Sequence, residues 1–284
     1  MKKFIKNVLE NTYTEEDKLK MLQDVANKKV TPSELADIVK YLKKKQAINI
    51  DLHNSIDICG TGGSGLDRIN TSTLACLKLA KMGVKIAKHG NNASSGRFGS
   101  FDLIEKLGYT IPNTNEEILN EFKNNNIAFL YAKNFFPFMR EFAEVRKNYG
   151  KPTIFNILGP LLSPANSNYQ MIGCSFDDKM ELMIETCKIL GRKNVIIVRG
   201  QDGLDEVTLT GKTKVYELKN GKIKNYDISP NDFGYDIVKL EEILEKDIEK
   251  KIEIAKKIIA GEKVGAYSNL VDINVKVVLD FLLK

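Results

Sequence analysis

The sequence has 284 residues, 43% hydrophobic and 28% charged, and no apolar run approaches the roughly 18 residues of a membrane span. This excludes a membrane protein and allows one large or two smaller globular domains. The net charge of +6 comes mainly from lysines in mixed-charge stretches, which are typical of solvated helix faces and argue against a nucleic-acid-binding protein.

The N-terminal residues are predicted to form helices. Thr31-Pro32-Ser33-Glu34 is a capping box with proline at the first helical position, and apolar residues follow it on one face. We therefore predict a small helical domain over residues 1–50, with a later helix and the C-terminal helix as candidate additions. The N-terminus lacks the apolar core of an export signal, and the four cysteines lack CxxC spacing. Both features favour a cytoplasmic protein with free thiols.

Short apolar runs alternate with helical stretches from residue 56 onward. This alternation predicts an α/β domain over residues 55–284, with a mostly parallel central sheet, hinged to the small helical domain. The predicted strands are Ile56–Cys59, Val84–Ala87, Ile127–Tyr131, Thr153–Leu158 and Val195–Val198. The predicted helices are Ser72–Met82, Ser100–Leu107, Glu116–Phe122, capped by Thr114, and Asp177–Leu190.

The last third of the chain begins with a predicted hairpin. Its strands, Lys214–Leu218 and Lys222–Tyr226, flank the turn Asn220-Gly221. A long amphipathic helix is expected next, with its apolar side running from Val238 to Ile252, and a final helix is expected over Leu270–Leu283.

A glycine-rich segment, Gly60-Thr61-Gly62-Gly63-Ser64, follows the first predicted strand and leads into a helix. Glycines allow backbone N–H groups to approach phosphate oxygens, and a helix N-terminus adds partial positive charge. The polar residues Asn70, Ser72 and Thr73 are placed to hold phosphate or metal. The alternative is a tight turn with an ordinary N-cap. The segment is neither a Walker loop nor a dinucleotide fingerprint, because neither glycine spacing is present.

A second polar segment, Lys88-His89-Gly90-Asn91, leaves the next predicted strand, and Ser95-Gly96-Arg97 follows it. A single histidine is more often a hydrogen-bonded buried side chain than a ligand. A lysine, a histidine and an asparagine in sequence favour instead a ligand site at the edge of the sheet, where open α/β sheets bind ligands.

Two further candidate sites have weaker support when each is taken alone. Asp205 and Glu206 follow the strand Val195–Val198 and a glycine turn, so they could hold Mg²⁺, although adjacent carboxylates are often merely exposed. Arg146 could clamp a planar carboxylate, although it could equally be a charge on a helix surface.

Taken in order, these motifs resemble those of the anthranilate phosphoribosyltransferases, in the nucleoside-phosphorylase-like phosphoribosyltransferase superfamily. The resemblance runs from about residue 14 to about residue 280. It rests on GTGG at Gly60–Gly63, Asn-x-Ser-Thr at Asn70–Thr73, KHGN at Lys88–Asn91, Val145-Arg146, the stretch Thr153–Pro160, GLDE at Gly203–Glu206 and the motif Ser229–Gly234.

The resemblance implies transfer of phosphoribosyl from phosphoribosyl diphosphate (PRPP) to the amine of anthranilate, with one or two Mg²⁺ ions and usually a homodimer. The catalytic residues that it implies are Lys88, His89 and Arg146. The implied PRPP site comprises Gly60, Thr61, Gly62, Gly63, Ser64, Arg68, Asn70, Ser72, Thr73 and Lys88. The implied anthranilate site comprises Gly60, His89, Asn91, Arg146 and Pro160. The implied metal ligands are Ser72, Asp205 and Glu206.

Four positions depart from the family pattern. Ser64 replaces an aspartate, and Arg68 replaces a threonine and offers a substitute phosphate contact. Asn92 replaces an arginine, and Phe136 replaces a histidine. The alternatives are therefore a PRPP-dependent transferase with another acceptor, or a catalytically silent paralogue that binds nucleic acid through its lysines.

Overall fold

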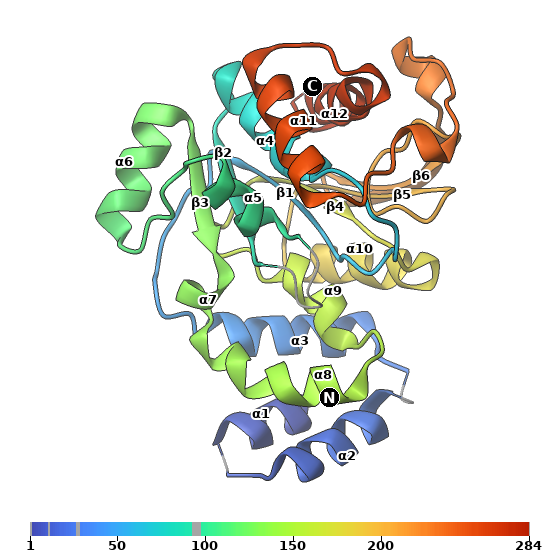
Figure 1. The fold of residues 1–284 in the computed structure, drawn as a ribbon. Coiled ribbons are helices and arrows are strands. Elements are labelled where there is room, and N and C mark those ends of the chain that lie inside the picture. The colour runs from blue at the N-terminus through green and yellow to red at the C-terminus, as the bar shows by residue number, and fades with distance from the viewer. Residues whose placement is uncertain (1, 11, 27–28, 93–97, 284) are drawn as a thin grey trace.

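The computed structural model describes residues 2–10, 12–26, 29–92 and 98–283. The expected segment Ser95-Gly96-Arg97 lies outside these residues. Helices α1 (Lys2–Glu10), α2 (Glu15–Ala26) and α3 (Pro32–Lys43) lie at one end of the molecule (Figure 1). The predicted cap of α3 is confirmed, since Thr31 and Glu34 form a reciprocal capping box. No helix in the described part of the chain is both long and apolar enough to cross a bilayer.

A seven-stranded sheet lies at the centre of the remaining chain, and its strand order is β3-β2-β1-β4-β5-β6-β7. The first five strands in this order are parallel, and β6 and β7 are antiparallel. The strands are β1 (Ile56–Gly60), β2 (Ile86–Gly90), β3 (Ile127–Tyr131), β4 (Tyr169–Gly173), β5 (Asn194–Gly200), β6 (Thr213–Lys219) and β7 (Lys222–Ile228). The mostly parallel α/β sheet and the hairpin are as predicted.

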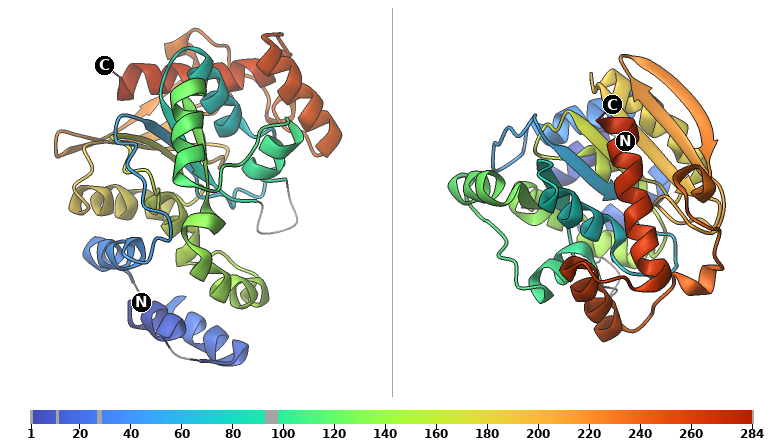
Figure 2. Two further views of the ribbon diagram at one scale, coloured as in Figure 1. Left: turned by 90° about the vertical axis from the view of Figure 1, so that its left-hand side faces the viewer. Right: turned by 90° about the horizontal axis from the view of Figure 1, so that it is seen from above.

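Helices cover both faces of the sheet (Figures 1 and 2). On one face lie α4 (Thr71–Lys81), α11 (Ile248–Ala260) and α12 (Gly265–Val277), packed on Ile56, Ile58 and other strand residues. On the other face lie α9 (Ile154–Leu161), α10 (Met180–Ile189) and α3, packed on the alternate strand residues. The side chains of each strand alternate between two hydrophobic cores.

Shorter elements complete the chain. They are α5 (Ser100–Lys106), α6 (Asn115–Asn125), α7 (Ala132–Phe135) and α8 (Ala143–Tyr149), with short helical turns η1 (Pro137–Phe142), η2 (Asp177–Lys179), η3 (Pro230–Phe233), η4 (Leu240–Glu242) and η5 (Val278–Leu282). Helix α8 packs against α2. The C-terminal helix α12 packs against α4. The division into two domains stays a prediction.

Several predicted elements need correction. Thr153–Leu158 is not a strand, because Thr153 caps α9 through a capping box with Asn156. The strand predicted at Val84–Ala87 begins two residues later, since a turn at Gly83 precedes it. The sequence analysis also missed β4, whose short run contains a glutamine and carries no clear periodicity. The long helix expected from Val238 begins only at Ile248, because Asp247 is the residue that caps α11.

Candidate active site

The candidate site lies where the carboxyl ends of β1 and β4 meet. The chain leaves β1 toward β2 and β3 on one side, and later returns to the other side of β1 as β4. Such a reversal of strand order opens a crevice at the carboxyl ends of parallel strands, where α/β proteins bind ligands. Gly60 and Gly173, the last residues of the two strands, are directly paired.

These two glycines allow an acidic loop to approach the sheet closely. A Cβ atom at Gly60 would lie 2.4 Å from Asp205 Oδ2, and one at Gly173 would lie 1.7 Å from the backbone oxygen of Asp205. Real side chains do not tolerate such distances. Glycine at both positions is therefore needed to seat residues 201–212 over the strand ends.

The glycine-rich loop after β1 is tied to β4 by three hydrogen bonds. The Thr61 N–H donates to the Gly173 carbonyl at 2.9 Å, and the Ser175 N–H donates to the Thr61 hydroxyl at 3.0 Å. The Ser175 hydroxyl donates to the Gly62 carbonyl at 2.9 Å. Gly62 and Gly63 have φ angles of 63° and 90°, which favour glycine. The loop thus has a fixed backbone path beside the acidic pair.

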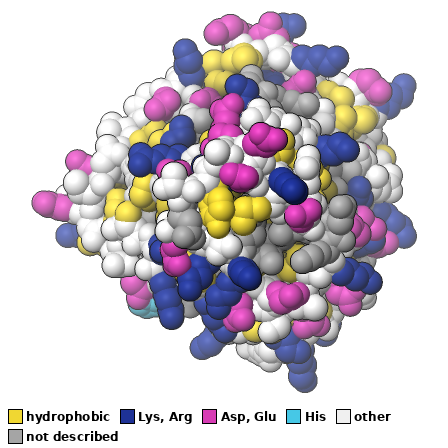
Figure 3. All heavy atoms as spheres, turned by 90° about the horizontal axis from the view of Figure 1, so that it is seen from below, with side chains coloured by type: hydrophobic (Ala, Val, Ile, Leu, Met, Phe, Trp, Pro, Cys, Tyr) yellow, Lys and Arg dark blue, Asp and Glu magenta, His cyan; other side chains and the backbone are white. Residues whose placement is uncertain are grey.

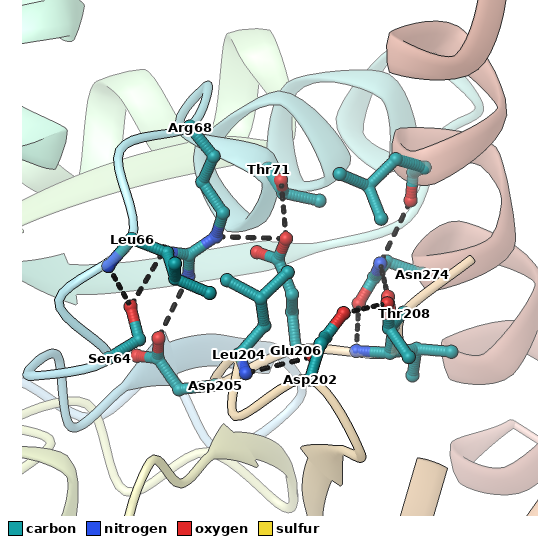
Figure 4. A network of polar contacts seen from close by, with 12 residues as sticks. Ser64, Leu66, Arg68, Thr71, Asp202, Leu204, Asp205, Glu206, Thr208 and Asn274 are labelled. Carbon is teal, nitrogen blue, oxygen red and sulfur yellow. Dashed lines mark hydrogen bonds and ion pairs between the residues drawn. The ribbon is translucent and has the colours of Figure 1, made fainter. Parts of the chain in front are cut away.

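Asp205 and Glu206, predicted as metal ligands, both face Arg68 (Figure 4). A terminal nitrogen of Arg68 lies 2.8 Å from Asp205 Oδ1, and Arg68 Nε lies 2.9 Å from Glu206 Oε1. The Gly62 N–H donates to Asp205 Oδ2 at 2.9 Å, and the Thr71 hydroxyl donates to Glu206 Oε1 at 3.1 Å. The two carboxylates therefore lie beside the glycine-rich loop, on either side of a guanidinium.

The protonation of this cluster follows from its burial. Burial raises the pKa of Glu206 to about 7, against the opposing effect of Arg68. Burial alone would lower the pKa of Arg68, but Glu206 and Asp205 more than reverse this and raise it. Arg68 therefore remains a cation at neutral pH.

The rest of the acidic loop is held by residues that the sequence analysis did not single out. Asp202 accepts hydrogen bonds from the Leu204 N–H at 3.0 Å and from the hydroxyls of Thr208 and Thr210. Asn274 of α12 accepts from the Val207 N–H at 3.1 Å and donates to the Val207 carbonyl at 2.9 Å. Asn274 is distant in sequence from the loop, so no local pattern could have identified it.

The start of α4 contributes polar atoms without partners. Asn70 Oδ1 and Thr73 Oγ1 are buried, and neither has a hydrogen-bond partner among the described residues. A buried polar atom without a partner costs free energy, unless a ligand supplies the missing bond. Ser72, predicted as a metal ligand, has no hydrogen bond to either carboxylate in the described chain, whereas its neighbour Thr71 bonds Glu206.

Lys88 lies in the middle of β2 and not in a segment that leaves the strand, and its side chain is buried. Its side chain is only 1% exposed, and its ammonium donates to the Ile58 carbonyl at 3.0 Å. The register of β1 and β2 pairs Ile56 with Ile86 alone, so Lys88 bridges the strands where they separate.

His89 is bound at both ring nitrogens. Nδ1 lies 2.7 Å from Asp57 Oδ2, and Nε2 lies 3.1 Å from the Gly159 carbonyl. A carboxylate and a carbonyl only accept, so each ring nitrogen of His89 faces a hydrogen-bond acceptor. Together, His89 and Lys88 help hold the pKa of Asp57 below its ordinary value, although burial raises it. His89, predicted as catalytic, links β1 to the end of α9 through these two contacts.

Two residues that the sequence analysis missed continue this network to the end of α9. Gln170 Nε2 donates to Asp57 Oδ2 at 2.8 Å and to the Pro160 carbonyl at 2.9 Å. Arg192 donates to Gln170 Oε1 and, at 2.6 Å, to the Leu161 carbonyl. Three successive carbonyls at the end of α9 are therefore bonded by side chains.

Arg146 of α8 lies against the same helix. Its guanidinium is 5.5 Å from the centre of the Phe155 ring, and burial lowers its pKa. Asn91, also predicted for this side of the site, is exposed, and its side chain accepts from the Asn92 N–H at 2.9 Å.

The comparisons with known sequences point to a single family. The profile of the glycosyl transferase family a/b domain matches residues 52–281. The anthranilate phosphoribosyltransferase of Geobacillus sp. (strain WCH70) is 36% identical over 249 residues, which cover 88% of this chain and 74% of that protein. That of Alkaliphilus metalliredigens (strain QYMF) is 39% identical over 245 residues, which cover 86% of this chain and 72% of the relative.

Solved structures agree. The crystal structure of anthranilate phosphoribosyltransferase from Thermus thermophilus superposes with a TM-score of 0.89 and 29% identity, over 99% of this chain and 84% of that one. The Saccharomyces cerevisiae enzyme, in complex with PRPP and Mg, superposes with a TM-score of 0.82 and 25% identity, over 97% of this chain and 80% of that one.

Proposed function

The chain belongs to the anthranilate phosphoribosyltransferase family, and from this membership we propose that it transfers the phosphoribosyl group of PRPP to the amine of anthranilate and releases diphosphate. The observation that carries the proposal is the meeting of the Gly60–Gly63 loop with Asp205 and Glu206 at the strand crossover. This arrangement combines backbone N–H groups with paired carboxylates, which suits a ligand that carries both phosphate and a divalent cation.

The donor side would be formed by the glycine loop and the start of α4. Asn70 and Thr73 offer buried polar atoms that lack partners in the described protein. The Thr73 hydroxyl would donate to a diphosphate oxygen, and Asn70 Oδ1 would accept from a ribose hydroxyl. Asp205 and Glu206 would hold Mg²⁺, since they already attract a cation, Arg68. When bound, Mg²⁺ would neutralise negative charge on the leaving diphosphate.

The acceptor side would be formed by α8, α9 and the end of β2. Arg146 would face the anthranilate carboxylate, with Asn91 and Pro160 beside the ring, and His89 would fix the position of α9. In the reaction the amine nitrogen forms a bond to C1′ of the ribose while the bond from C1′ to the diphosphate oxygen breaks. An aromatic amine is neutral and nucleophilic at pH 7, so positioning suffices and no strong base is needed.

Loss of anthranilate fluorescence in the presence of PRPP and Mg²⁺ tests this function. The double variant Asp205→Asn/Glu206→Gln should lose at least about 10³-fold in kcat/KM, because the charge that binds the metal is removed. The control is Asp227→Asn, a half-exposed aspartate of β7. Fluorescence loss that survives in the double variant would contradict the metal site. PRPP binding without any reaction of anthranilate would favour a transferase with another acceptor.

The proposal includes a homodimer and a cytoplasmic location. A cleft between α1 and η1 offers a surface of mixed polarity for self-association, with Val8, Leu9 and Phe138 beside Lys18 and Glu141. Light scattering should give twice the chain mass of 32.0 kDa. On the face seen in Figure 3, basic and acidic side chains are interspersed, which does not suit the nucleic-acid-binding alternative. A salt-dependent DNA shift without PRPP binding would favour that alternative.

A further inference from the structure

Arg68 occupies the position of a cation between two carboxylates, and this has a functional consequence. Its backbone pairs with Leu244 in an isolated antiparallel bridge, and the Glu245 N–H donates to the Asp67 carbonyl at 2.9 Å. The loop is thereby fixed on its outer side. Figure 4 shows the Arg68 side chain pointing inward, toward Asp205 and Glu206.

The contacts of Arg68 are shared among three partners. One terminal nitrogen lies 2.8 Å from Asp205, Nε lies 2.9 Å from Glu206, and the other terminal nitrogen lies 3.4 Å from the Ser64 hydroxyl. The Nε N–H does not point at the Glu206 oxygen closely enough to form a hydrogen bond. Strong arginine–carboxylate pairs use two parallel N–H···O bonds to one carboxylate. Arg68 forms no such bidentate pair and divides its contacts between two carboxylates.

Charge makes Arg68 and a divalent cation competitors. The guanidinium neutralises half of the formal charge of the acidic pair, and it repels a second cation at distances of a few ångströms. The Arg68 side chain is 17% exposed, against 6% for Asp205 and 4% for Glu206. The guanidinium therefore separates the two carboxylates from solvent on its own side, and it must move before an ion can reach both of them.

We propose that Arg68 is an internal counter-ion that keeps Mg²⁺ off Asp205 and Glu206 until the polyanionic donor binds. The donor's phosphates then form ion pairs with the guanidinium in place of Asp205 and Glu206, and these two carboxylates become free to bind the metal. This inference rests on the proposed function for the identity of the donor. It makes Arg68 a residue that couples binding of metal and donor, so each should tighten binding of the other by the same factor.

The test measures Mn²⁺ binding to the complete protein without substrates, from the electron paramagnetic resonance signal of free Mn²⁺. Arg68→Met, which keeps the length of the side chain and removes its charge, should bind Mn²⁺ at least about tenfold more tightly than the wild type. Arg140→Met is the matched control, because Arg140 is 83% exposed and pairs only weakly with Glu141. It removes the same charge and should leave Mn²⁺ affinity unchanged.

Two further variants make the result specific. Adding Asp205→Asn/Glu206→Gln to Arg68→Met should abolish the gain, which would locate it at the acidic pair. Arg68→Lys retains a positive charge and should keep Mn²⁺ affinity low. Arg68→Gln, which also removes the charge, replaces Arg68→Met if that variant does not fold. Adding PRPP should tighten Mn²⁺ binding by a larger factor in the wild type than in Arg68→Met.

Equal Mn²⁺ affinity of the wild type and the Arg68→Met variant, or equal tightening by PRPP in both, would overturn the inference. Either result would make Arg68 a fixed structural ion pair. Because the main measurement uses metal alone, its failure is distinct from failure of the proposed function, which would appear as absent turnover in the wild type.

Discussion

The two halves of the candidate site differ in how completely their buried polar groups are paired. On the acceptor side, Asp57, His89, Gln170 and Arg192 form a continuous network that ends on the carbonyls of α9. On the donor side, Asn70 Oδ1 and Thr73 Oγ1 lack partners among the described residues, and Arg68 is shared loosely between two carboxylates.

This difference separates stability from binding. A fully paired buried network stabilises the fold and fixes geometry, so its loss should appear first in the free energy of unfolding. Unpaired atoms lower stability slightly and gain their bonds only from a ligand, so their loss should appear first in affinity. Under the proposed function, the acceptor side would be a preformed support, and a bound donor would complete the hydrogen bonds of the other side.

The largest effect on stability is expected for Asp57→Asn. Asp57 Oδ2 accepts from Gln170 Nε2 and faces His89 Nδ1, and Oδ1 accepts from the His89 backbone N–H at 3.3 Å. An amide has only one oxygen, so its NH2 group would face one of these donors, and the buried negative charge near Lys88 would be lost. We expect the free energy of unfolding to fall by roughly 2–4 kcal/mol, measured by urea denaturation.

Asp51 provides the matched control. It faces the chain's other histidine, His53, at 3.3 Å, but both side chains are more than half exposed. Asp51→Asn should change stability by less than about 0.5 kcal/mol. If the two variants cost the same, the buried network would not be the main support of α9.

Thr73→Val is expected to have a smaller effect on stability than Asp57→Asn, and to weaken PRPP binding instead. The hydroxyl of Thr73 is buried without a partner, so its removal should leave stability unchanged or raise it by up to about 1 kcal/mol. PRPP affinity, measured by calorimetry, should fall by about tenfold, because the ligand loses one hydrogen bond.

Thr71→Val is the comparison within the same helical turn. Thr71 is equally buried, but its hydroxyl donates to Glu206 at 3.1 Å, so this variant should lose about 1 kcal/mol of stability. A loss of stability in Thr73→Val as large as in Thr71→Val would show that the donor side is paired after all.

Asp272 of α12 lies outside both halves of the site, and the smallest effect on stability is expected there. Its carboxylate forms ion pairs with Lys78 of α4 and, at 2.8 Å, with Lys263. Although burial raises its pKa, the two lysines lower it below the ordinary 3.8, so the pair stabilises the fold above that pH. Asp272→Asn should cost about 1 kcal/mol at pH 7, and the cost should shrink as the pH falls below about 4. A cost that does not change with pH would contradict this ion pair.

The sequence predicted best what depends on local pattern. The caps at Thr31 and Thr114, the hairpin at Asn220-Gly221 and the strand Ile127–Tyr131 follow from spacing and turn residues, and all are present. Thr153–Leu158 was misassigned because a short apolar run fits a buried strand or a buried helix equally well.

The sequence predicted less well what depends on pairing at a distance. The glycine loop and the acidic pair were both identified, but their contact through Gly60 and Gly173 depends on strand order. Arg68 was expected to contact phosphate, and its place between the carboxylates comes from a side-chain direction that no motif encodes. Asn274 and Gln170 lack any local signal, since their partners lie far along the chain.

The insertion of β4 beside β1 also constrains the order in which the molecule can fold. Asp57 and Gln170 are 113 residues apart, and Gly62 and Asp205 are 143 residues apart. During synthesis, β1, β2 and β3 emerge long before their central neighbour, so one edge of β1 stays unpaired while more than a hundred residues are added. Contacts of such separation form slowly and leave strand edges open to association. The ligand crevice is thus among the last features to close, and a nascent chain that stops before β4 exposes the strand on which the crevice is built.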